Sequence, residues 1–179
     1  TFWGGMVDFD AVPLTRAVQK GWLAGIAGDE GVNDVNAPHK IKSLGIKVEV
    51  TKSSSIVDYN ELVEVKTTAS DGGENSVSGT LLGKANDPRI VEVDGNAIEV
   101  RPVDLLLVVR NVDKPGIVGK LGKILGDHGV NIANMSLSRA DCGEHALTIC
   151  ELDEEPDQAV LGLLEAEPDI REARISRQS

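Results

Sequence analysis

Residues 104–139 carry the sequence DLLLVVRNVDKPGIVGKLGKILGDHGVNIANMSLSR, and the apolar pattern changes twice along this stretch. Five consecutive apolar residues, Leu105 to Val109, have the length and composition of a buried strand. After the turn at Pro115-Gly116, apolar residues recur at helical spacing, at Ile117, Leu121, Ile124 and Leu125. Gly129 ends the helix after His128, and Val130 to Arg139 reads as a strand again. The stretch therefore predicts strand, helix, strand.

The residues that follow complete this unit. Glu144 to Leu152 predicts a strand, joined to the one before it by an Ala-Asp-Cys-Gly turn. We expect Pro156 to begin a second helix, because proline favours the first helical turn, and Pro168 to Ile175 to form a last strand. The buried stripe of that helix would be Val160, Leu163 and Leu164. The order β-α-β-β-α-β is that of a ferredoxin-like split unit.

The first half of the chain predicts an α+β domain. In some of its segments the apolar residues recur at helical spacing, and in others they alternate with polar residues as in strands. We expect Gly45 to end the second helix, and tight turns at Asp71-Gly72-Gly73 and Asp94-Gly95-Asn96. These elements are a strand from Thr1 to Val7, helices over Val12–Gly28 and Asn33–Ser43, and strands over Ile46–Thr51, Glu61–Thr68, Ser76–Leu82, Ile90–Val93 and Ala97–Val100. Arg101-Pro102 ends the series. We therefore predict an α+β chain of two domains, residues 1–101 with an antiparallel sheet and residues 102–179 with the ferredoxin-like unit.

Composition and charge exclude several classes of function. The 179 residues include 18 Lys and Arg against 29 Asp and Glu, a net charge of −11. This argues against binding the backbone of a nucleic acid or an anionic membrane surface, which attract cations. Residues 141–179 hold a net −8 of that charge, and we expect a solvated acidic surface there. No apolar run reaches the length of a membrane-spanning helix. The strand pattern from Thr1 suggests a piece of a longer polypeptide.

The sequence predicts neither catalytic nor metal-binding residues. Cys142 and Cys150 would lie about 26 Å apart on one strand, too far for a disulfide, so we expect reduced thiols and a cytoplasmic protein. His39, His128 and His145 fall in separate elements, and His128 at a helix C-terminus suits the helix dipole. Nucleotide-binding glycine motifs and zinc-protease motifs do not occur.

A small-molecule site is more credible at the turn before the helix. Asp113-Lys114-Pro115-Gly116 places backbone N–H groups at a helix N-terminus, where an anion is stabilised. Asn111 and Asp113 flank this turn, and we expect Asn131 to begin a strand beside the first one. Amide and carboxylate groups complement the two ends of an α-amino acid, although Asn and Asp also commonly form Asx-turns. We attribute the glycines at 116, 119 and 122 to close packing of the helix on its sheet.

Different segments of the chain resemble two domain families. Asn-Val-Asp-Lys-Pro-Gly-Ile-Val-Gly and Gly-Val-Asn-Ile-Ala-Asn-Met, within residues 104–139, resemble an ACT domain, a regulatory module that binds amino acids. Earlier segments resemble the intervening domain of long-form 3-phosphoglycerate dehydrogenases: Val32–Pro38, Ser78–Lys84, Asp87–Val91 and Asp94-Gly95. The matches follow the family's order over almost the whole chain. The resemblance implies the C-terminal regulatory region of an NAD-dependent enzyme of serine biosynthesis, with NAD bound elsewhere in the polypeptide and no cofactor in this region.

The resemblance also implies two sites. In the family, ACT domains pair side by side and hold L-serine across the interface. The matching effector positions here are Asn111, Asp113, Pro115, Gly116 and Asn131. The intervening domain binds an anion or a phosphorylated substrate through basic residues, which match Arg89 and Arg101 and, less closely, Lys84. A further basic position of the family is occupied by Glu151.

Two other proteins remain alternatives. The β chain of iron–sulfur L-serine dehydratase combines similar domains but carries a Ser-Ser-Ser-His-Thr motif, whereas Ser53-Ser54-Ser55 is followed by Ile56. A stand-alone amino-acid sensor built on an ACT domain is the second alternative. For the regulatory region that the resemblance implies we expect a homo-oligomer with a continuous sheet across two ACT domains, because a domain of about 75 residues buries little surface and leaves sheet edges open.

Overall fold

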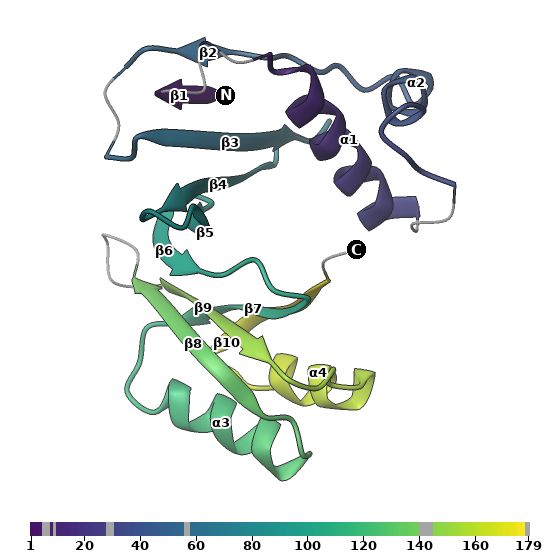
Figure 1. Ribbon diagram of the computed structural model, residues 1–179. Coiled ribbons are helices and arrows are strands. Elements are labelled where there is room, and N and C mark those ends of the chain that lie inside the picture. Colours follow the sequence, from purple (N-terminus) through teal and green to yellow (C-terminus); the bar gives the residue numbers. More distant parts are fainter. Residues whose placement is uncertain (5–7, 9, 28–30, 56–57, 140–144, 178–179) are drawn as a thin grey trace. The chain divides into compact units, whose positions relative to one another are not determined.

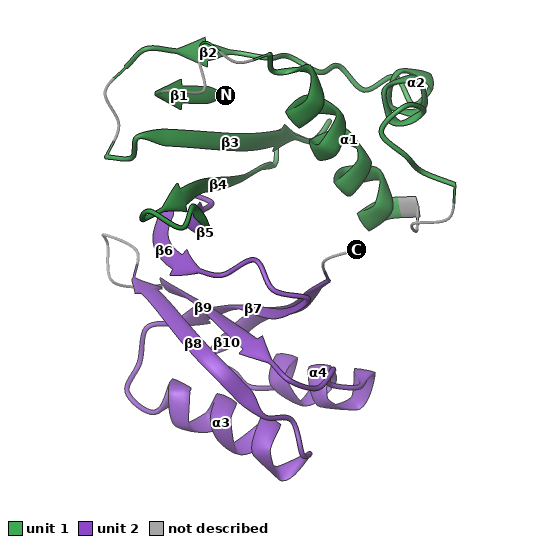
Figure 2. Cartoon of the chain, viewed as in Figure 1, with its two compact units in different colours: residues 1–87, 179 green, residues 88–178 purple. Residues whose placement is uncertain are grey.

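The computed structural model describes the chain except residues 5–7, 9, 28–30, 56–57, 140–144 and 178–179. It forms two compact units, Thr1–Asp87 and Pro88–Gln178 (Figure 2). Both units mix helices with sheet, which confirms the predicted α+β class. No helix among the described residues is long and apolar enough to cross a membrane.

The first unit joins two helices to an arrangement of four strands. The helices are α1 (Val12–Ala27) and α2 (Ala37–Ser43); the strands are β1 (Phe2–Gly4), β2 (Lys52–Ser53), β3 (Glu61–Thr68) and β4 (Glu74–Leu82). The strand order is β2-β1-β3-β4 (Figure 1). β2 runs parallel to β1, and the other neighbours are antiparallel. The predicted strand over Glu61–Thr68 and the hairpin after it are confirmed.

The two helices pack on each other around a small core. Leu23, Val32, Ala37 and Ile41 are buried together, and Trp22 packs against them. The end of α2 follows the helix-stop prediction: Gly45 has a φ of +72°, its N–H donates to the carbonyl of Lys42, and the N–H of Ile46 donates to that of Ile41. This pair of bonds is a Schellman motif, which glycine adopts without steric cost.

The predicted strand over Ile46–Thr51 is wrong. These residues belong to no strand, and β2 begins only at Lys52. Apolar and polar residues do alternate here, but among the described residues no neighbouring strand forms a hydrogen-bond ladder with them. β1 contacts this segment only at Thr51, whose carbonyl accepts from the N–H of Phe2. A strand needs a hydrogen-bonded neighbour as well as an alternating sequence.

The second unit contains the predicted ferredoxin-like order. After a hairpin of β5 (Asp87–Val93) and β6 (Asn96–Val100) come β7 (Leu105–Val112), α3 (Ile117–Asp127), β8 (Ile132–Arg139), β9 (His145–Leu152), α4 (Gln158–Glu165) and β10 (Ile170–Arg177). The last four strands form a sheet in the order β10-β7-β9-β8, with every neighbouring pair antiparallel. The hairpin turn Asp94-Gly95 has positive φ at both residues, as a two-residue hairpin requires.

Both faces of this four-stranded sheet are covered. On one face α3 and α4 bury a continuous cluster with Leu107, Val109 and Cys150 of the sheet. On the other face the β5–β6 hairpin packs Ile98 and Val100 against Leu106, Leu147 and Ile149. The alternation of side chains along β7 and β9 explains why one sheet buries apolar residues on both sides.

Polar contacts hold the hairpin to the sheet. Arg110 of β7 pairs with Asp94 at the hairpin turn and, at 3.2 Å, with Glu172 of β10. The Ser136 hydroxyl donates to the carbonyl of Glu99 at 2.7 Å. The compact units divide at the start of the hairpin, between Asp87 and Pro88. The predicted domain boundary at Arg101-Pro102 divides the sequence by motif, and it stays a prediction.

Two local predictions about the helices are corrected. Pro156 does not begin α4: Asp157 is the N-cap, and its carboxylate accepts from the N–H of Val160 at 2.9 Å. Leu163 is exposed, while Val160 and Leu164 are buried as expected. Close packing does not explain the glycines of α3, since a methyl group added at Gly119 or Gly122 would meet no atom within 4 Å outside the local helix backbone.

Candidate functional site

Asn111, the first of the predicted effector residues, is buried at the end of β7. Only 1% of its surface is exposed. Its Nδ2 donates to the carbonyl of Val112, and its Oδ1 accepts from the hydroxyl of Thr148 on β9, both at 3.0 Å. A buried amide must satisfy its polar atoms, so these two hydrogen bonds fix Asn111 at the strand end, and its burial keeps the side chain away from solvent.

Asp113 lies just beyond the end of β7, in the turn that leads to α3. Its carboxylate contacts Nε of Arg139 at 3.1 Å. Arg139 ends β8, so this ion pair joins the turn to the end of the outer strand of the sheet. A carboxylate beside a guanidinium complements the ammonium and carboxylate of a free amino acid.

The rest of the turn is exposed and polar. Lys114 pairs with Asp169 at 2.7 Å, which lowers the pKa of the Asp169 carboxyl through the hydrogen bond and the nearby charge. Pro115 and Gly116 are exposed, and Gly116 precedes α3 with a φ of +94° and no side-chain cap. The N–H of Ile117 donates to the carbonyl of Lys114 at 3.4 Å, and the exposed residues Val118 and Gly119 carry the next two N–H groups of the first turn of α3, a position that suits a carboxylate.

Asn131 is not beside this turn, so the expectation of adjacent strands is wrong. β9 lies between β7 and β8 in the sheet. Asn111 pairs with Ala146 at one end of β9, whereas the Asn131 carbonyl accepts from the N–H of Asp153 just past the other end. Seven residues of strand separate those partners, about 24 Å. Asn131 itself donates to Asp153 and Glu154.

The predicted anion-binding residues have carboxylate partners. Nε of Arg89 lies 3.4 Å from Glu99, and Arg101 donates to Glu151 at 3.2 Å. Glu151 is 4% exposed and also accepts from the Nδ2 of Asn134 at 3.0 Å. These carboxylates neutralise the two guanidinium groups. Lys84 is exposed in the first unit, whereas both arginines belong to the second.

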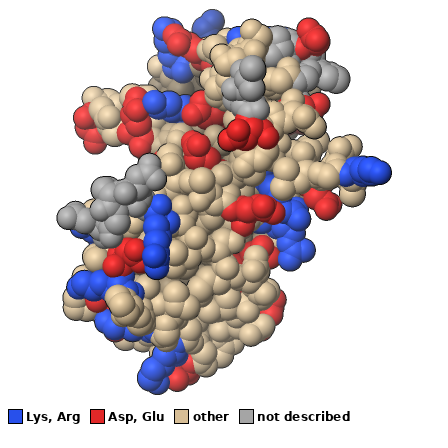
Figure 3. All heavy atoms as spheres, turned by 90° about the vertical axis from the view of Figure 1, so that its left-hand side faces the viewer, with Lys and Arg blue, Asp and Glu red and all other residues tan. Residues whose placement is uncertain are grey.

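Charges of opposite sign are also interspersed on one face of the surface. On the face in Figure 3, blue and red side chains lie next to one another rather than in separate fields. Several of the exposed lysines have carboxylate partners, as Lys120 does with Glu167 at 2.6 Å. Local ion pairing thus reduces the attraction that any one basic side chain exerts on an external anion.

The thiol of Cys150 and the imidazole of His128 have structural surroundings. Burial raises the pKa of the Cys150 thiol to about 12, so it stays protonated and unreactive. Nδ1 of His128 lies 2.8 Å from the carbonyl of Ile124 at the end of α3, as its position predicted. Cys142, which is predicted to lie too far from Cys150 for a disulfide, is outside the described residues. No group of three metal-ligating side chains occurs among the described residues.

Sequence reasoning missed three residues around these sites. Arg139 and Thr148 contact Asp113 and Asn111, and Asn134 contacts Glu151. The correct strand order would have pointed to them, because it places the end of β8 near the end of β7 and brings β9 between the two strands. Thr148, an uncharged polar residue in an apolar strand, was the clearest sequence signal.

Family models match both units of the chain. The D-3-phosphoglycerate dehydrogenase intervening domain matches residues 1–94, and the ACT domain matches residues 105–169. The chain belongs to the D-3-phosphoglycerate dehydrogenase intervening-domain family. The ACT domain that follows corresponds to β7 through α4 and supplies the turn that contains Asp113. This pair of domains confirms the family resemblance drawn from the sequence motifs.

Several D-3-phosphoglycerate dehydrogenases are similar over most of the chain. The enzyme of Synechocystis sp. is 37% identical over 171 residues, which cover 95% of this chain and 30% of that protein. The enzymes of Mycobacterium leprae and Bacillus subtilis are 36% and 32% identical over 85% and 96% of this chain. The chain spans 29 to 32% of the length of these three relatives.

Proposed function

We propose that this chain is the regulatory region of an NAD-dependent D-3-phosphoglycerate dehydrogenase. The NAD-binding and catalytic groups belong to another part of the polypeptide, and the protein works in the cytoplasm as a homo-oligomer. The ACT domain binds a small amino acid, L-serine, as the effector. The relatives support the proposal that the enzyme containing this region is a D-3-phosphoglycerate dehydrogenase, since the three compared above all carry that name.

The placement of Asp113 and Asn131 supports a site shared by two copies. Within one chain they lie at opposite ends of the sheet, yet the ion pair between Asp113 and Arg139 brings Asp113 to the end of the outer strand β8. If two copies join antiparallel along β8, the start of one β8 meets the end of the other. Asn131 of one copy then lies next to Arg139 and Asp113 of its partner.

The chemistry of that shared site suits a free amino acid. Asp113 accepts from the ammonium group, and Arg139 and the N-terminus of α3 bind the carboxylate. Asn131 donates to a polar side chain or to the carboxylate. Pro115 and Gly116 form the turn, and Asn111 holds the end of β7 in place rather than contacting the effector. Within a single copy Asp113 and Asn131 lie at opposite ends of the sheet, too far apart to bind one amino acid.

Thermal unfolding with and without L-serine tests the proposal. We expect L-serine to raise the melting temperature, since a ligand that binds only the folded state stabilises it by mass action. Asp113→Ala and Asn131→Ala should each abolish the shift, whereas Lys123→Ala, which removes an exposed ion pair with Asp127 on α3, should keep it. An unchanged response in Asp113→Ala would remove this residue from the site.

A second ligand remains a proposal for the basic residues. Arg89 and Arg101 are proposed to bind a phosphorylated metabolite, although Glu99 and Glu151 partly neutralise them. Lys84, which belongs to the first unit, is proposed separately as a weaker anion-binding residue. Calorimetry with 3-phosphoglycerate on the whole chain and on Arg101→Gln tests the proposal for the arginines directly. We expect weak binding that disappears in the variant; equal binding by both chains would exclude Arg101.

A further inference from the structure

The ion pair between Arg101 and Glu151 joins a basic residue of the proposed anion site to a buried carboxylate. The side chain of Arg101 is 60% exposed, whereas Glu151 is buried, and Nη2 of Arg101 donates to Oε2 of Glu151 at 3.2 Å. Both residues belong to the second unit, where Arg101 follows β6 and Glu151 lies on β9 (Figure 1). A carboxylate of the chain itself thus contacts the group that is proposed to bind an external anion.

Glu151 is held in place by the sheet. It pairs with Leu106 of β7, and paired residues share a face, so Glu151 lies on the face that the β5–β6 hairpin covers. Its second carboxylate oxygen, Oε1, accepts from Nδ2 of Asn134 on β8 at 3.0 Å. Each oxygen therefore has a donor, and the carboxylate cannot turn away from Arg101 without losing a hydrogen bond in a buried place.

A shift in the register of β8 brings Asn134 to this carboxylate. Ile132 pairs with Leu152, so a regular ladder would place Ala133 opposite Glu151, but the register shifts and Asn134 takes that position. A β-bulge redirects side chains in this way. The amide of Asn134 donates a hydrogen bond but carries no charge. The carboxylate is thereby fixed in position while its negative charge remains.

Arg101 is more open to an external anion than Arg89 is. The side chain of Arg89 is 21% exposed, its Nη1 donates to the carbonyl of Pro88 at 2.8 Å, and its Nε lies 3.4 Å from Glu99. Arg101 is 60% exposed, and a guanidinium has five N–H donors. An anion from solvent can therefore reach Arg101 while the ion pair with Glu151 stays intact.

We infer that Glu151 is an internal competitor for Arg101, which lowers the affinity of this arginine for external anions, and lowers it more for dianions than for monoanions. The inference rests on the proposed anion site at Arg101. An anion that leaves the ion pair intact is repelled by Glu151. An anion that displaces Arg101 leaves the buried carboxylate with Asn134 as its partner, which is costly. Both routes weaken binding.

Coulomb's law gives the size of the effect. Two unit charges roughly 7 Å apart, on two sides of one guanidinium, repel by about the thermal energy in water, which lowers affinity about threefold. For a dianion this factor is squared, to about sevenfold. The repulsion grows where a carboxylate is shielded from water, as Glu151 is. The charge of the anion therefore decides how strongly Glu151 opposes it.

Glu151→Gln tests the inference, because it removes the charge and keeps a hydrogen-bonding side chain of the same size. Sulfate and methanesulfonate, tetrahedral sulfur oxyanions with two charges and one, are titrated at constant ionic strength and followed by the NMR shifts of backbone amides. We expect the variant to bind sulfate about sevenfold more tightly than the wild type does, and methanesulfonate about threefold. Adding Arg101→Gln to the variant should remove both gains.

Asp127→Asn is the matched control. It removes one negative charge from α3, which packs on the opposite face of the sheet, so it should leave both dissociation constants unchanged. The inference is overturned if Glu151→Gln binds both anions as the wild type does, or if the gain is equal for the two anions. It is also overturned if Asp127→Asn gives the same gain, or if the gain survives Arg101→Gln.

Calorimetry with 3-phosphoglycerate separates this inference from the proposed function. Wild-type binding that Arg101→Gln removes and Glu151→Gln does not strengthen would uphold the anion site and overturn the inference. Binding that appears in Glu151→Gln and is absent from the wild type would uphold the inference and exclude 3-phosphoglycerate as a ligand of the wild-type chain. Absence of anion binding from both chains would overturn both.

Discussion

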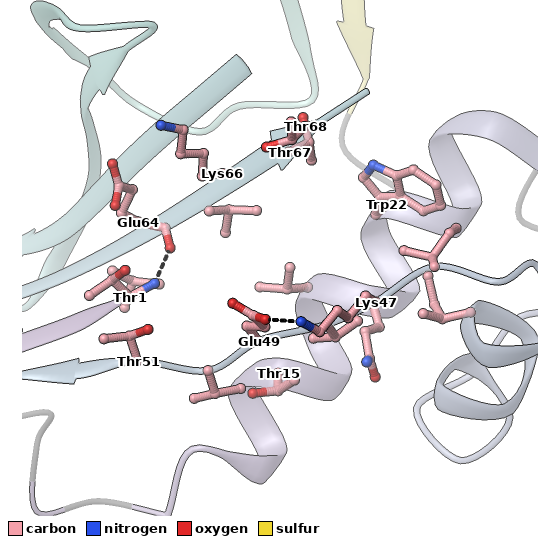
Figure 4. A pocket seen from close by; sticks show the side chains of 18 of the residues that line it. Thr1, Thr15, Trp22, Lys47, Glu49, Thr51, Glu64, Lys66, Thr67 and Thr68 are labelled. Atoms are coloured by element: carbon pink, nitrogen blue, oxygen red, sulfur yellow. Dashed lines mark hydrogen bonds and ion pairs between the residues drawn. The ribbon is translucent and has the colours of Figure 1, made fainter. Parts of the chain in front are cut away.

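In the second unit, twelve buried residues form one cluster, eleven from five elements and Val130 from the loop after α3, and a further cluster lies beneath the hairpin on the opposite face of the sheet. Among the described residues of the first unit the corresponding cluster has four members, and an open cavity of about 780 Å³ lies beside it (Figure 4). Both sequences have the periodicity of helices and strands. The comparison teaches that periodicity forms the elements, whereas contacts between layers decide how much stability they give.

The largest expected effect comes from truncating one core leucine in the second unit. Leu125 is fully buried between α3 and the sheet, so Leu125→Ala should lower the free energy of unfolding by about 2–5 kcal/mol. The matching change in the first unit is Ile41→Ala, whose side chain lines the cavity and has fewer contacts to lose, so we expect about 2 kcal/mol. Urea unfolding, monitored by hydrogen exchange in each unit, measures both losses of unfolding free energy. A larger loss for Ile41→Ala than for Leu125→Ala would contradict the contrast.

A smaller effect, different for the two partners, is expected at the ion pair between Arg101, just after β6, and Glu151 of β9. Arg101→Met leaves the buried Glu151 carboxylate with only Asn134 as a partner, so it should cost about 2–3 kcal/mol. Glu151→Gln keeps a hydrogen-bonding side chain, and Arg101, 60% exposed, can turn to water, so it should cost under about 1 kcal/mol. Urea unfolding of the two variants measures the difference. Equal losses would show that Glu151 does not depend on Arg101.

The effect that is smallest at neutral pH is a pH dependence from Cys150. Its folded pKa is raised to about 12, above the ordinary value of 9.0. The neutral thiol is therefore favoured by folding, and the associated stability is complete below pH 9 and is lost as pH rises from 9 toward 12. The slope from this group is about 1.4 kcal/mol per pH unit. Cys150→Ala should show a flatter decline in urea unfolding; equal slopes would contradict the burial of this thiol.

The sequence was most informative where a local signal decides the structure. Asp94-Gly95 predicted a hairpin because positive φ at both residues suits this dipeptide, and the helix stops at Gly45 and Gly129 followed from the same freedom. One prediction is wrong because a distant contact decides: residues 46–51 have the alternation of a strand but lack a hydrogen-bonded neighbour among the described residues. The other error is local: proline favours a first helical turn, but Asp157 caps α4 through its side chain, one residue after Pro156.

The predicted site was partly misplaced for a similar reason. Sequence motifs identified the turn around Asp113 but gave no strand order, so they put Asn131 beside Asn111 when β9 lies between their strands. They also could not show that Asn111 is buried against Thr148. Arg139 follows from the register of β8, which no motif contains.

Mixing two inactive variants tests the central claim, a site completed by two copies, most directly. Asp113→Ala and Asn131→Ala should each bind no L-serine in calorimetry. After their subunits exchange, each mixed pair holds one site with both residues intact, so the mixture should recover about a quarter of the wild-type sites. A mixture that binds no more L-serine than its two components, or a single variant that binds as the wild type does, would contradict the shared site.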